Sequence, residues 1–533
     1  MQQRPRRRSR PRSRLVAPLA AGLALTLGGT LAWNAAADGD ATADLAASID
    51  EILADPRLDG AHAGVVVLDA ATGETLYDHE GADRLTPASN AKLLTSAAAV
   101  DTLGADYRYV TDLATDGTVT GGTLAGDLYL RGSGDPTMLA EDYDALAADL
   151  AAAGVTEVSG DLVADDTRFD DVRLGTAWAW DSESDYFAAQ TSALTLAPDT
   201  DYDSGNVYLE TSPGATEGDK PQVTMQPAND YVTLVNEATT VAAGEDNTLN
   251  ITREHGTNTI VISGQVPADA GTTQTWNPVW EPTGYAAAVF ADALAAHGIG
   301  LAGDTVLGRA TPADAEVLAS HESMTLAELL VPFLKLSNNM HAEALVKTLG
   351  HEAGGAGTWD AGLDVVEAYA DGLGVTAGSY LQVDGSGLSR MSTVSPESLA
   401  TLLVEVRDEP WFDAWYEALP IACQPDRLTG GTLRTRMCDT PASGNAHAKT
   451  GSLTGASGLS GYVTAADGRE LVFSILFNDH LGAAPTDLQD AIVATLAGDQ
   501  SEPAQTRTHE ADPATEPATL DLECSWLKPA ATC

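Results

Sequence analysis

The sequence predicts an α+β protein in which a domain of helices and antiparallel strands is interrupted by two β-rich inserted domains. Helical spacing of apolar residues appears early, at residues 91–103, and again in the second half of the chain. Between these segments lie short apolar runs punctuated by Gly, Asn and Asp, which are typical of strands and turns. The folded part then ends with three successive strand patterns and one helix. An interrupted α+β domain accounts for this order of elements.

The helices and strands behind this fold class can be assigned to ranges. Helical periodicity is strongest at residues 91–103, 143–153, 284–297, 325–334, 341–349 and 397–406. Thr325 and Glu328 form a capping-box pattern at the start of one of these helices. Strand runs at 128–130, 222–225 and 260–262 lie within two β-rich stretches, 119–169 and 202–267. The closing elements are strands at 446–450, 458–464 and 471–477 and a helix at 486–496.

The composition indicates a globular and strongly acidic protein. Hydrophobic residues make up 44% of the 533 residues, which is more than a disordered chain contains. There are 77 acidic against 28 basic residues, and beyond residue 37 the balance is 77 against 21, or −56. This charge argues against nucleic acid and anionic lipid as partners, because both are bound by clustered Lys and Arg. We interpret the acidity as a solvated surface. Lysine occurs only at positions 92, 220, 335, 347, 449 and 528.

Residues 1–37 resemble an export signal. Seven arginines precede an apolar run at residues 15–33, and small residues at 35–37 offer a cleavage site. The alternative is a signal anchor, because an apolar run of this length can span a bilayer. Small and turn-forming residues within the run favour cleavage as a signal peptide.

Four cysteines, Cys423, Cys438, Cys524 and Cys533, fit an exported protein in an oxidising compartment. Three connectivities are possible, and pairing Cys423 with Cys438 and Cys524 with Cys533 needs the shortest loops. No Cys-x-x-Cys spacing occurs, so we expect no metal site from these residues. Residues 501–533 form an acidic tail rich in Pro and Thr, with a tip bounded by the last two cysteines.

The first motif with chemical meaning is Ser89-Asn90-Ala91-Lys92 at the start of the helix predicted for residues 91–103. Residues three apart on a helix share one face, so the hydroxyl and the amine can meet. The helix N-terminus also offers backbone N–H groups to an oxyanion. The motif is weak by itself, because the tail contains a second Ser-x-x-Lys pattern at Ser525 and Lys528.

Two further motifs follow in the second half of the chain. Ser337-Asn338-Asn339 lies between two predicted helices, and an ordinary helix cap is the alternative interpretation. Lys449-Thr450-Gly451 ends the strand predicted for 446–450, and a strand end with a glycine bulge is the alternative there. Composition predicts only about 0.05 Lys-Thr-Gly triplets by chance.

In this order the three motifs resemble those of the active-site-serine penicillin-recognising enzymes, with Asn338 where the Ser-Asp-Asn form has Asp. Within that group the sequence is similar to the D-alanyl-D-alanine carboxypeptidase/endopeptidases of the class C low-molecular-mass penicillin-binding proteins, the penicillin-binding protein 4 type. That family inserts extra domains between the first two motifs, and the resemblance covers nearly all of residues 50–500. Similar stretches also lie at 126–130, 134–137, 163–169, 178–180, 192–194, 384–389 and 431–434.

The resemblance implies a domain organisation. Residues 38–107 and 298–500 would form a DD-peptidase domain with the penicillin-binding, β-lactamase-like fold. Residues 108–297 would form the inserted β-rich region, comprising two domains. The sequence departs from the family at residues 423–430, a lengthened loop that Cys438 is placed to staple and that precedes the Lys449 strand.

The resemblance also implies roles for the motif residues in cleaving a D-Ala-D-Ala peptide. Ser89 would attack the carbonyl of the penultimate D-alanine, and Lys92 would take its proton. Ser337 would relay a proton to the leaving amine. Asn339 would bind the substrate amide and help to hold Lys92.

The remaining implied roles concern the carboxylate and the oxyanion. Lys449 and Thr450 would grip the terminal carboxylate, and Gly451 would let the strand approach the substrate. Backbone N–H groups of Ser89 and Ser452 would form the oxyanion hole. The reaction needs no metal and no cofactor.

The expected substrates are peptidoglycan stem peptides ending in D-Ala-D-Ala, with β-lactam antibiotics as inhibitors. The expected location is extracytoplasmic: secreted, or associated with the wall or the membrane. Two alternatives stay open: a β-lactamase or esterase with the same fold, and a non-catalytic wall-binding protein on this scaffold. No His-Glu-x-x-His or Gly-x-Ser-x-Gly pattern occurs, which disfavours metalloprotease and α/β-hydrolase chemistry.

Overall fold

A computed structural model describes residues 43–498, and its α+β architecture confirms the predicted fold class. The central sheet has five antiparallel strands in the order β2-β1-β24-β23-β22. Their bounds are β1 His62–Asp69, β2 Thr75–His79, β22 His447–Leu453, β23 Ala456–Thr464 and β24 Glu470–Asn478. Two strands from the start of the chain therefore complete a sheet whose other strands come from its end.

Both faces of this sheet are covered, as the burial of β1 shows. Val65 and Val67 pack in one cluster with the helix over residues 43–53 and with α10 (Thr486–Ala497). Val66 and Leu68 point the other way and pack with α2 (Ala91–Leu103) and α8 (Pro396–Glu405). Successive strand residues face opposite sides of a sheet, so burial on both sides requires the continuous apolar run that β1 contains.

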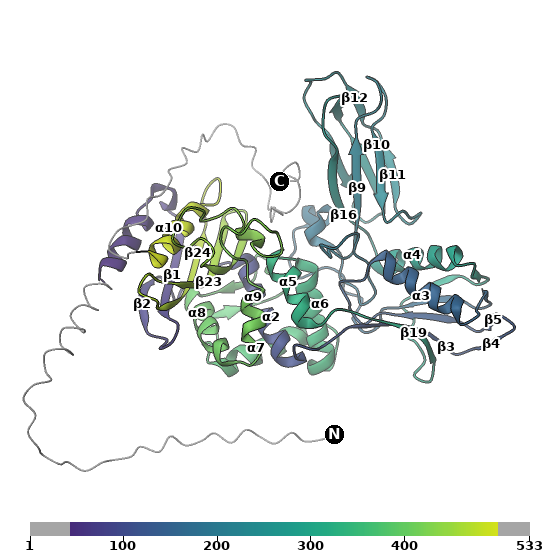
Figure 1. The fold of residues 1–533 in the computed structure, drawn as a ribbon, viewed down its shortest axis with the longest axis horizontal. Coiled ribbons are helices and arrows are strands. Elements are labelled where there is room, and N and C mark those ends of the chain that lie inside the picture. The colour runs from purple at the N-terminus through teal and green to yellow at the C-terminus, as the bar shows by residue number, and fades with distance from the viewer. Residues whose placement is uncertain (1–42, 499–533) are drawn as a thin grey trace, which may run out of the picture.

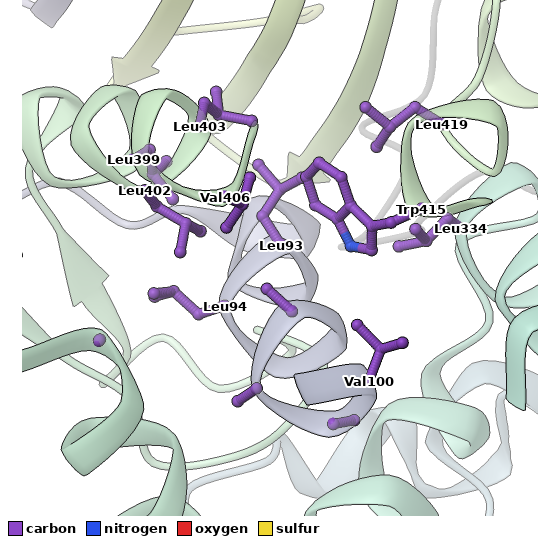
Figure 2. Packing of buried hydrophobic residues seen from close by; sticks show 14 of the residues in the cluster. Leu93, Leu94, Val100, Leu334, Leu399, Leu402, Leu403, Val406, Trp415 and Leu419 are labelled. Atoms are coloured by element: carbon purple, nitrogen blue, oxygen red, sulfur yellow. The ribbon is translucent and has the colours of Figure 1, made fainter. Parts of the chain in front are cut away.

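Helix α2 lies at the centre of the helical layer (Figure 2). Every residue from Ala91 to Val100 is buried, so α2 is a core helix except for its last turn. Leu93 and Leu94 pack with side chains from α8, and the Trp415 indole donates to Ser96 Oγ at 2.8 Å. The surrounding helices are α5 Leu326–Lys335, α6 Asn339–Leu349, α7 Trp359–Leu373, α8 and α9 Phe412–Glu417. Residues that start α2 are therefore held by the core itself.

The β-rich inserted region forms the other end of the molecule (Figure 1). One part contains the sheet β18-β8-β6-β3-β19, the sheet β17-β7-β5-β4 and helices α3 and α4. Another part contains the small sheets β10-β9-β16, β11-β14-β13 and β12-β15. The bounds of the helices are α3 Ala140–Ala152 and α4 Pro282–Ala296. The bounds of the strands are β3 Val110–Thr115, β4 Thr118–Thr120, β5 Thr123–Ala125, β6 Leu128–Arg131, β7 Glu157–Val158, β8 Leu162–Asp165, β9 Asn206–Ser212, β10 Gln222–Gln226, β11 Thr233–Asn236, β12 Thr239–Val241, β13 Asn250–Arg253, β14 Thr259–Ser263, β15 Gln265–Pro267, β16 Thr273–Pro278, β17 Gly300–Leu301, β18 Thr305–Leu307 and β19 Glu316–Glu322.

The strand pairing bears on where the inserted region ends. Strands β17, β18 and β19 follow the predicted boundary at residue 297, yet they pair with β7, β8 and β3. We therefore propose that the inserted region extends to about residue 322, where β19 ends. The other predicted domain boundaries stay predictions.

The individual elements match the sequence patterns closely. Helix α2 has the predicted bounds, and α3, α4, α6 and α8 each begin one to three residues earlier than their apolar periodicity. Thr325 caps α5: its Oγ1 accepts from Glu328 N at 3.3 Å, and the Glu328 carboxylate accepts from Thr325 N at 2.8 Å. Helices α7 and α9 were not predicted, because α7 contains interior glycines and α9 spans only six residues.

The predicted export signal at residues 1–37 and the tail at 501–533 lie outside the described residues. Within residues 43–498, none of the helices has both the length and the apolar composition that a bilayer span requires.

The packing around α2 predicts a large stability effect of Leu402→Ala. Leu402 is buried in α8 within the α2 cluster, so truncation leaves a cavity and should lower the free energy of unfolding by about 2–5 kcal/mol. Chemical denaturation of the purified protein measures this change. Leu481→Ala is the control, because Leu481 is 94% exposed, and it should change stability by no more than about 0.5 kcal/mol. Equal effects of the two substitutions would contradict this account of the core.

Candidate active site

Ser89 and Lys92 meet at the entrance to α2. A short 3-10 turn, Ala88–Asn90, leads directly into α2, so Ser89 lies one turn before Lys92 on the same face. Lys92 Nζ donates to Ser89 Oγ at 2.6 Å. Both side chains are buried, at 4% and 0% exposure, and Ala88 enters the turn with a positive φ of 46°. The structure thus places the candidate nucleophile and base in direct contact inside the core.

The Ser337-Asn338-Asn339 motif forms the tight connection between α5 and α6. Ser337 has a φ of 58°, an uncommon value for a residue with a side chain and one that often occurs at functional sites. Asn338 is the N-cap of α6 and accepts from His341 N at 3.2 Å. Asn339 Oδ1 accepts from Lys92 Nζ at 2.6 Å, while its Nδ2 donates to the Phe187 carbonyl at 3.0 Å. The cap interpretation therefore applies to Asn338, and Asn339 joins the site.

The contacts of Asn338 explain why this motif carries an amide where the Ser-Asp-Asn form of the motif has a carboxylate. Its Nδ2 lies 3.2 and 3.0 Å from the carbonyls of Asp201 and Tyr202, and 3.1 Å from Asp203 Oδ1. These three partners are oxygen acceptors and require a donor. An ionised Asp at this position could only accept, and it would face the Asp203 carboxylate.

The third motif lies on β22, at the edge of the sheet. Lys449 Nζ donates to Ser337 Oγ at 2.7 Å and to the Thr450 carbonyl at 2.8 Å, and Lys449 is fully buried. Thr450 Oγ1 donates to Thr432 Oγ1 at 2.9 Å. The three motifs therefore form two hydrogen-bonded groups. One joins Ser89, Lys92 and Asn339, and the other joins Ser337, Lys449 and Thr450. Thr432 is a neighbour that the sequence motifs do not include.

Gly451 allows β22 to approach the segment that carries Ser89. A Cβ at Gly451 would lie 2.6 Å from the Pro87 carbonyl oxygen and 3.1 Å from Ser89 N. Only a glycine fits such a close approach of two backbones. Ser452, the next residue of β22, is half-buried, and it pairs with Ser457 of β23. The strand backbone and the Ser89 backbone thus lie against each other.

Burial lowers the pKa values of two basic side chains near the motifs. Burial lowers the pKa of His341 to about 3, so its imidazole is neutral at physiological pH. Burial also lowers the pKa of Lys335 to about 8, and its ammonium donates to the Leu419 carbonyl. The neighbouring histidine therefore adds no positive charge to the site.

Two buried carboxylates lie on segments close to Lys92, and neither belongs to the three motifs. Glu343 lies in α6, and burial together with the Asp384 charge raises its pKa to about 7. Burial also raises the pKa of Asp384, which begins the loop 384–389. The Ser386 carbonyl of that loop accepts from Lys92 Nζ at 3.2 Å. Glu343 resembles an ordinary polar helix residue in sequence, so only its spatial neighbours reveal it.

A separate polar cavity of about 640 Å³ lies where the inserted region meets the end of α6. Arg108, Arg131 and Arg168 line it, and none of the three motifs does. Arg131 pairs with Asp112 and Arg168 with Glu352. The charges in this cavity are therefore largely balanced by neighbouring side chains.

The lengthened loop at residues 423–430 is stapled as its sequence predicts. Cys423 and Cys438 form a disulfide, which selects the local pairing for these two cysteines. Arg427 of the loop forms an ion pair with Asp201, the residue whose carbonyl accepts from Asn338. The loop thus packs beside the second motif. Cys524 and Cys533 lie outside the described residues.

Comparison with known proteins identifies the family. The sequence model of the D-Ala-D-Ala carboxypeptidase 3 (S13) family matches residues 45–498. The chain belongs to this family. This confirms, at the level of the family, the resemblance to D-alanyl-D-alanine carboxypeptidases and the predicted serine-type DD-peptidase activity.

Individual S13 relatives agree over most of the chain. A D-alanyl-D-alanine carboxypeptidase of Actinomadura sp. is 46% identical over 489 residues, which cover 91% of this chain and 90% of the relative. The crystal structure of penicillin binding protein 4 from Haemophilus influenzae has a TM-score of 0.72 at 25% identity and covers 82% of this chain and 94% of its own. A second structure of that protein, complexed with a β-lactam, has a TM-score of 0.68 at 23% identity and covers 84% of this chain and 98% of its own, a likeness in fold.

The close approach at Gly451 predicts a specific defect in Gly451→Ala. The added methyl group collides with the Ser89 segment, so β22 must move away and disturb the site. We expect the rate of acylation by a fluorescent penicillin to fall about 100-fold, because small displacements in an active site have effects of this size. Gly372→Ala in α7 is the control, since its Cβ meets nothing within 4 Å. Unchanged labelling of Gly451→Ala would refute the assignment.

Proposed function

We propose that this S13 peptidase cleaves peptidoglycan stem peptides at D-Ala-D-Ala through an acyl-enzyme on Ser89. The observation that carries the proposal is the contact of Lys92 Nζ with Ser89 Oγ at 2.6 Å and with Asn339 Oδ1 at 2.6 Å. A buried amine that touches a serine hydroxyl at a helix N-terminus is the arrangement that nucleophilic catalysis requires. Release of the terminal D-alanine is the carboxypeptidase reaction, and cleavage of cross-linked stem peptides would be the endopeptidase form.

Acylation begins with proton transfer from Ser89. Neutral Lys92 accepts the hydroxyl proton as Ser89 Oγ attacks the carbonyl carbon of the penultimate D-alanine. The oxyanion that forms would be stabilised by the backbone N–H groups of Ser89 and Ser452. The close approach of β22 to Ser89 N supports this pairing of donors.

Collapse of the tetrahedral intermediate breaks the C–N bond, and the leaving amine needs a proton. Ser337 suits this relay because it can pass its hydroxyl proton to the amine and take over the proton that Lys92 received from Ser89, while Lys449 Nζ donates to its oxygen at 2.7 Å and orients it. Lys449 and Thr450 lie on the same strand segment and would bind the terminal carboxylate of the substrate. Asn339 would bind the substrate amide while it orients Lys92.

Water then hydrolyses the ester and restores Ser89. A β-lactam would acylate Ser89 by the same attack, and slow hydrolysis of that ester would make it an inhibitor. A β-lactamase would instead hydrolyse the ester rapidly, so fast turnover of a chromogenic cephalosporin would favour that alternative. Release of D-alanine from a model peptide would exclude a non-catalytic wall-binding protein.

The substrate fixes where the protein acts. Peptidoglycan stem peptides lie outside the cytoplasmic membrane, so we propose an extracytoplasmic protein, secreted or held at the wall or the membrane by its N-terminal segment. The acidic surface argues against nucleic acid as a partner.

The decisive test of the nucleophile is Ser89→Ala. We expect loss of fluorescent-penicillin labelling and a fall in D-alanine release of at least about 10⁴-fold, because no other group can form the ester. Ser525→Ala, which removes the serine of the other Ser-x-x-Lys pattern, is the matched control and should label normally. Labelling that survives Ser89→Ala would disprove the mechanism.

Lys449→Ala tests the carboxylate-binding role. We expect peptide turnover to fall about 10²–10³-fold, since removal of one charge-stabilising donor costs this much. The melting temperature should change far less, by about 2–4 °C. Lys220→Ala removes an exposed lysine of the inserted region and should retain full turnover. An unchanged rate in Lys449→Ala would contradict the assignment.

A further inference from the structure

The orientation of the Lys92 amine depends on a backbone carbonyl as well as on side chains. As a neutral amine, Lys92 has two N–H donors and one lone pair. Asn339 Oδ1 at 2.6 Å and the Ser386 carbonyl at 3.2 Å can accept the two donors. The lone pair of the neutral amine would then face Ser89 Oγ, which lies 2.6 Å away and whose proton it must take. A shift of the Ser386 carbonyl would therefore misdirect the base.

Glu343 fixes the two peptide groups that immediately precede the Ser386 carbonyl. Its Oε2 accepts from Gly385 N at 2.8 Å, and its Oε1 accepts from Ser386 N at 2.9 Å. The Trp359 indole donates to Oε2 at 2.7 Å and holds the carboxylate in place. Carboxylates that accept backbone N–H groups form short and strong hydrogen bonds. One turn of α6 thus separates Asn339, which binds Lys92 directly, from Glu343, which sets the loop around Ser386.

A second carboxylate, Asp384, binds the peptide group of the Ser386 carbonyl itself, because the N–H of that group belongs to Gly387. Asp384 accepts from Gly387 N at 3.0 Å, from Ser389 N at 2.6 Å and from the Trp178 indole at 2.9 Å. The loop is also pressed against the Ser89 segment, since a Cβ at Gly387 would lie 2.0 Å from the Ala88 carbonyl oxygen. The loop backbone therefore has no room to adjust independently of Ser89.

Burying two carboxylates to hold one loop is unfavourable in free energy. Glu343 and Asp384 are both fully buried, and burying like charges together is unfavourable. Two buried lysines lie on neighbouring groups: Lys347 Nζ is 3.9 Å from the Trp359 ring centroid and is bonded to Asp170, and Lys92 is bonded to the Ser386 carbonyl. Clusters of this kind are typical of sites with a function.

We propose that Glu343 is a positioning residue for the reaction, which aims the Lys92 lone pair at Ser89 by fixing the two peptide groups that lead into the Ser386 carbonyl. Asp384 supports it by binding the Gly387 N–H of the peptide group that carries this carbonyl. The proposal rests on the proposed role of Lys92 as base and adds the element that orients it.

The experiment measures acylation by a fluorescent penicillin, per labelled site, as a function of pH. In Glu343→Gln one carboxylate oxygen becomes an NH₂ group that faces N–H donors, so the loop shifts and the maximal rate should fall about 10- to 100-fold. The profile should also change shape around pH 7, where the buried Glu343 carboxyl group titrates in the wild type and the glutamine cannot. A merely structural role would reduce the labelled fraction and leave the profile of each labelled site unchanged.

Glu343→Asp distinguishes the effect of the carboxylate charge from the effect of side-chain length. It keeps the negative charge but withdraws the carboxylate by one methylene, so the maximal rate should fall while the shape of the profile around pH 7 stays near that of the wild type. Glu367→Gln makes the same chemical change as Glu343→Gln at an exposed position of α7 and is the matched control; it should leave the rate and the pH profile unchanged. Wild-type rates and profiles in both Glu343 variants would overturn the proposal. Wild-type protein that is not labelled at Ser89 would instead overturn the proposed function.

Discussion

The buried amine of Lys92 is the constraint on which the rest of the site depends. A lysine inside a protein core is unfavourable unless oxygen acceptors replace the water that it loses. Here the acceptors come from three segments far apart in sequence: Ser89 Oγ, Asn339 Oδ1 and the Ser386 carbonyl. The helical layer must therefore bring α2, the start of α6 and the loop 384–389 to one point, and α2 can serve as their centre because its first ten residues are all buried.

The same constraint explains why the site lies between the sheet and the helices. The sheet contributes β22, whose Lys449 reaches across to Ser337 Oγ. The helices contribute the Ser89 turn, to which Gly451 lies too close for any side chain. The inserted region also takes part, since the Phe187 carbonyl accepts from Asn339 and the 201–203 segment accepts from Asn338. Distant parts of the chain are thus joined through hydrogen bonds to two adjacent asparagines.

The parts of this arrangement that depend on local geometry could be predicted from the sequence. The meeting of Ser89 with Lys92 follows from their three-residue spacing at a helix start, and the bounds of α2 follow from its apolar composition. The Ser386 carbonyl, the third acceptor of Lys92, could not be predicted, because a backbone carbonyl can belong to any residue type. Glu343 was missed for a related reason: in sequence, a glutamate in a helix is usually an exposed residue.

The placement of the lysines changes how the acidic composition is understood. Of the five lysines within residues 43–498, four are buried, at positions 92, 335, 347 and 449, and only Lys220 is exposed. Lysine is normally among the most exposed residues, so the described surface has nearly lost it while the interior has kept it. Each buried ammonium donates to an oxygen of the protein, such as Leu419 O for Lys335 and Asp170 for Lys347. The acidic surface and the buried cations are therefore separate adaptations: the first concerns solvation, and the second supplies positive charge where the fold and the site require it.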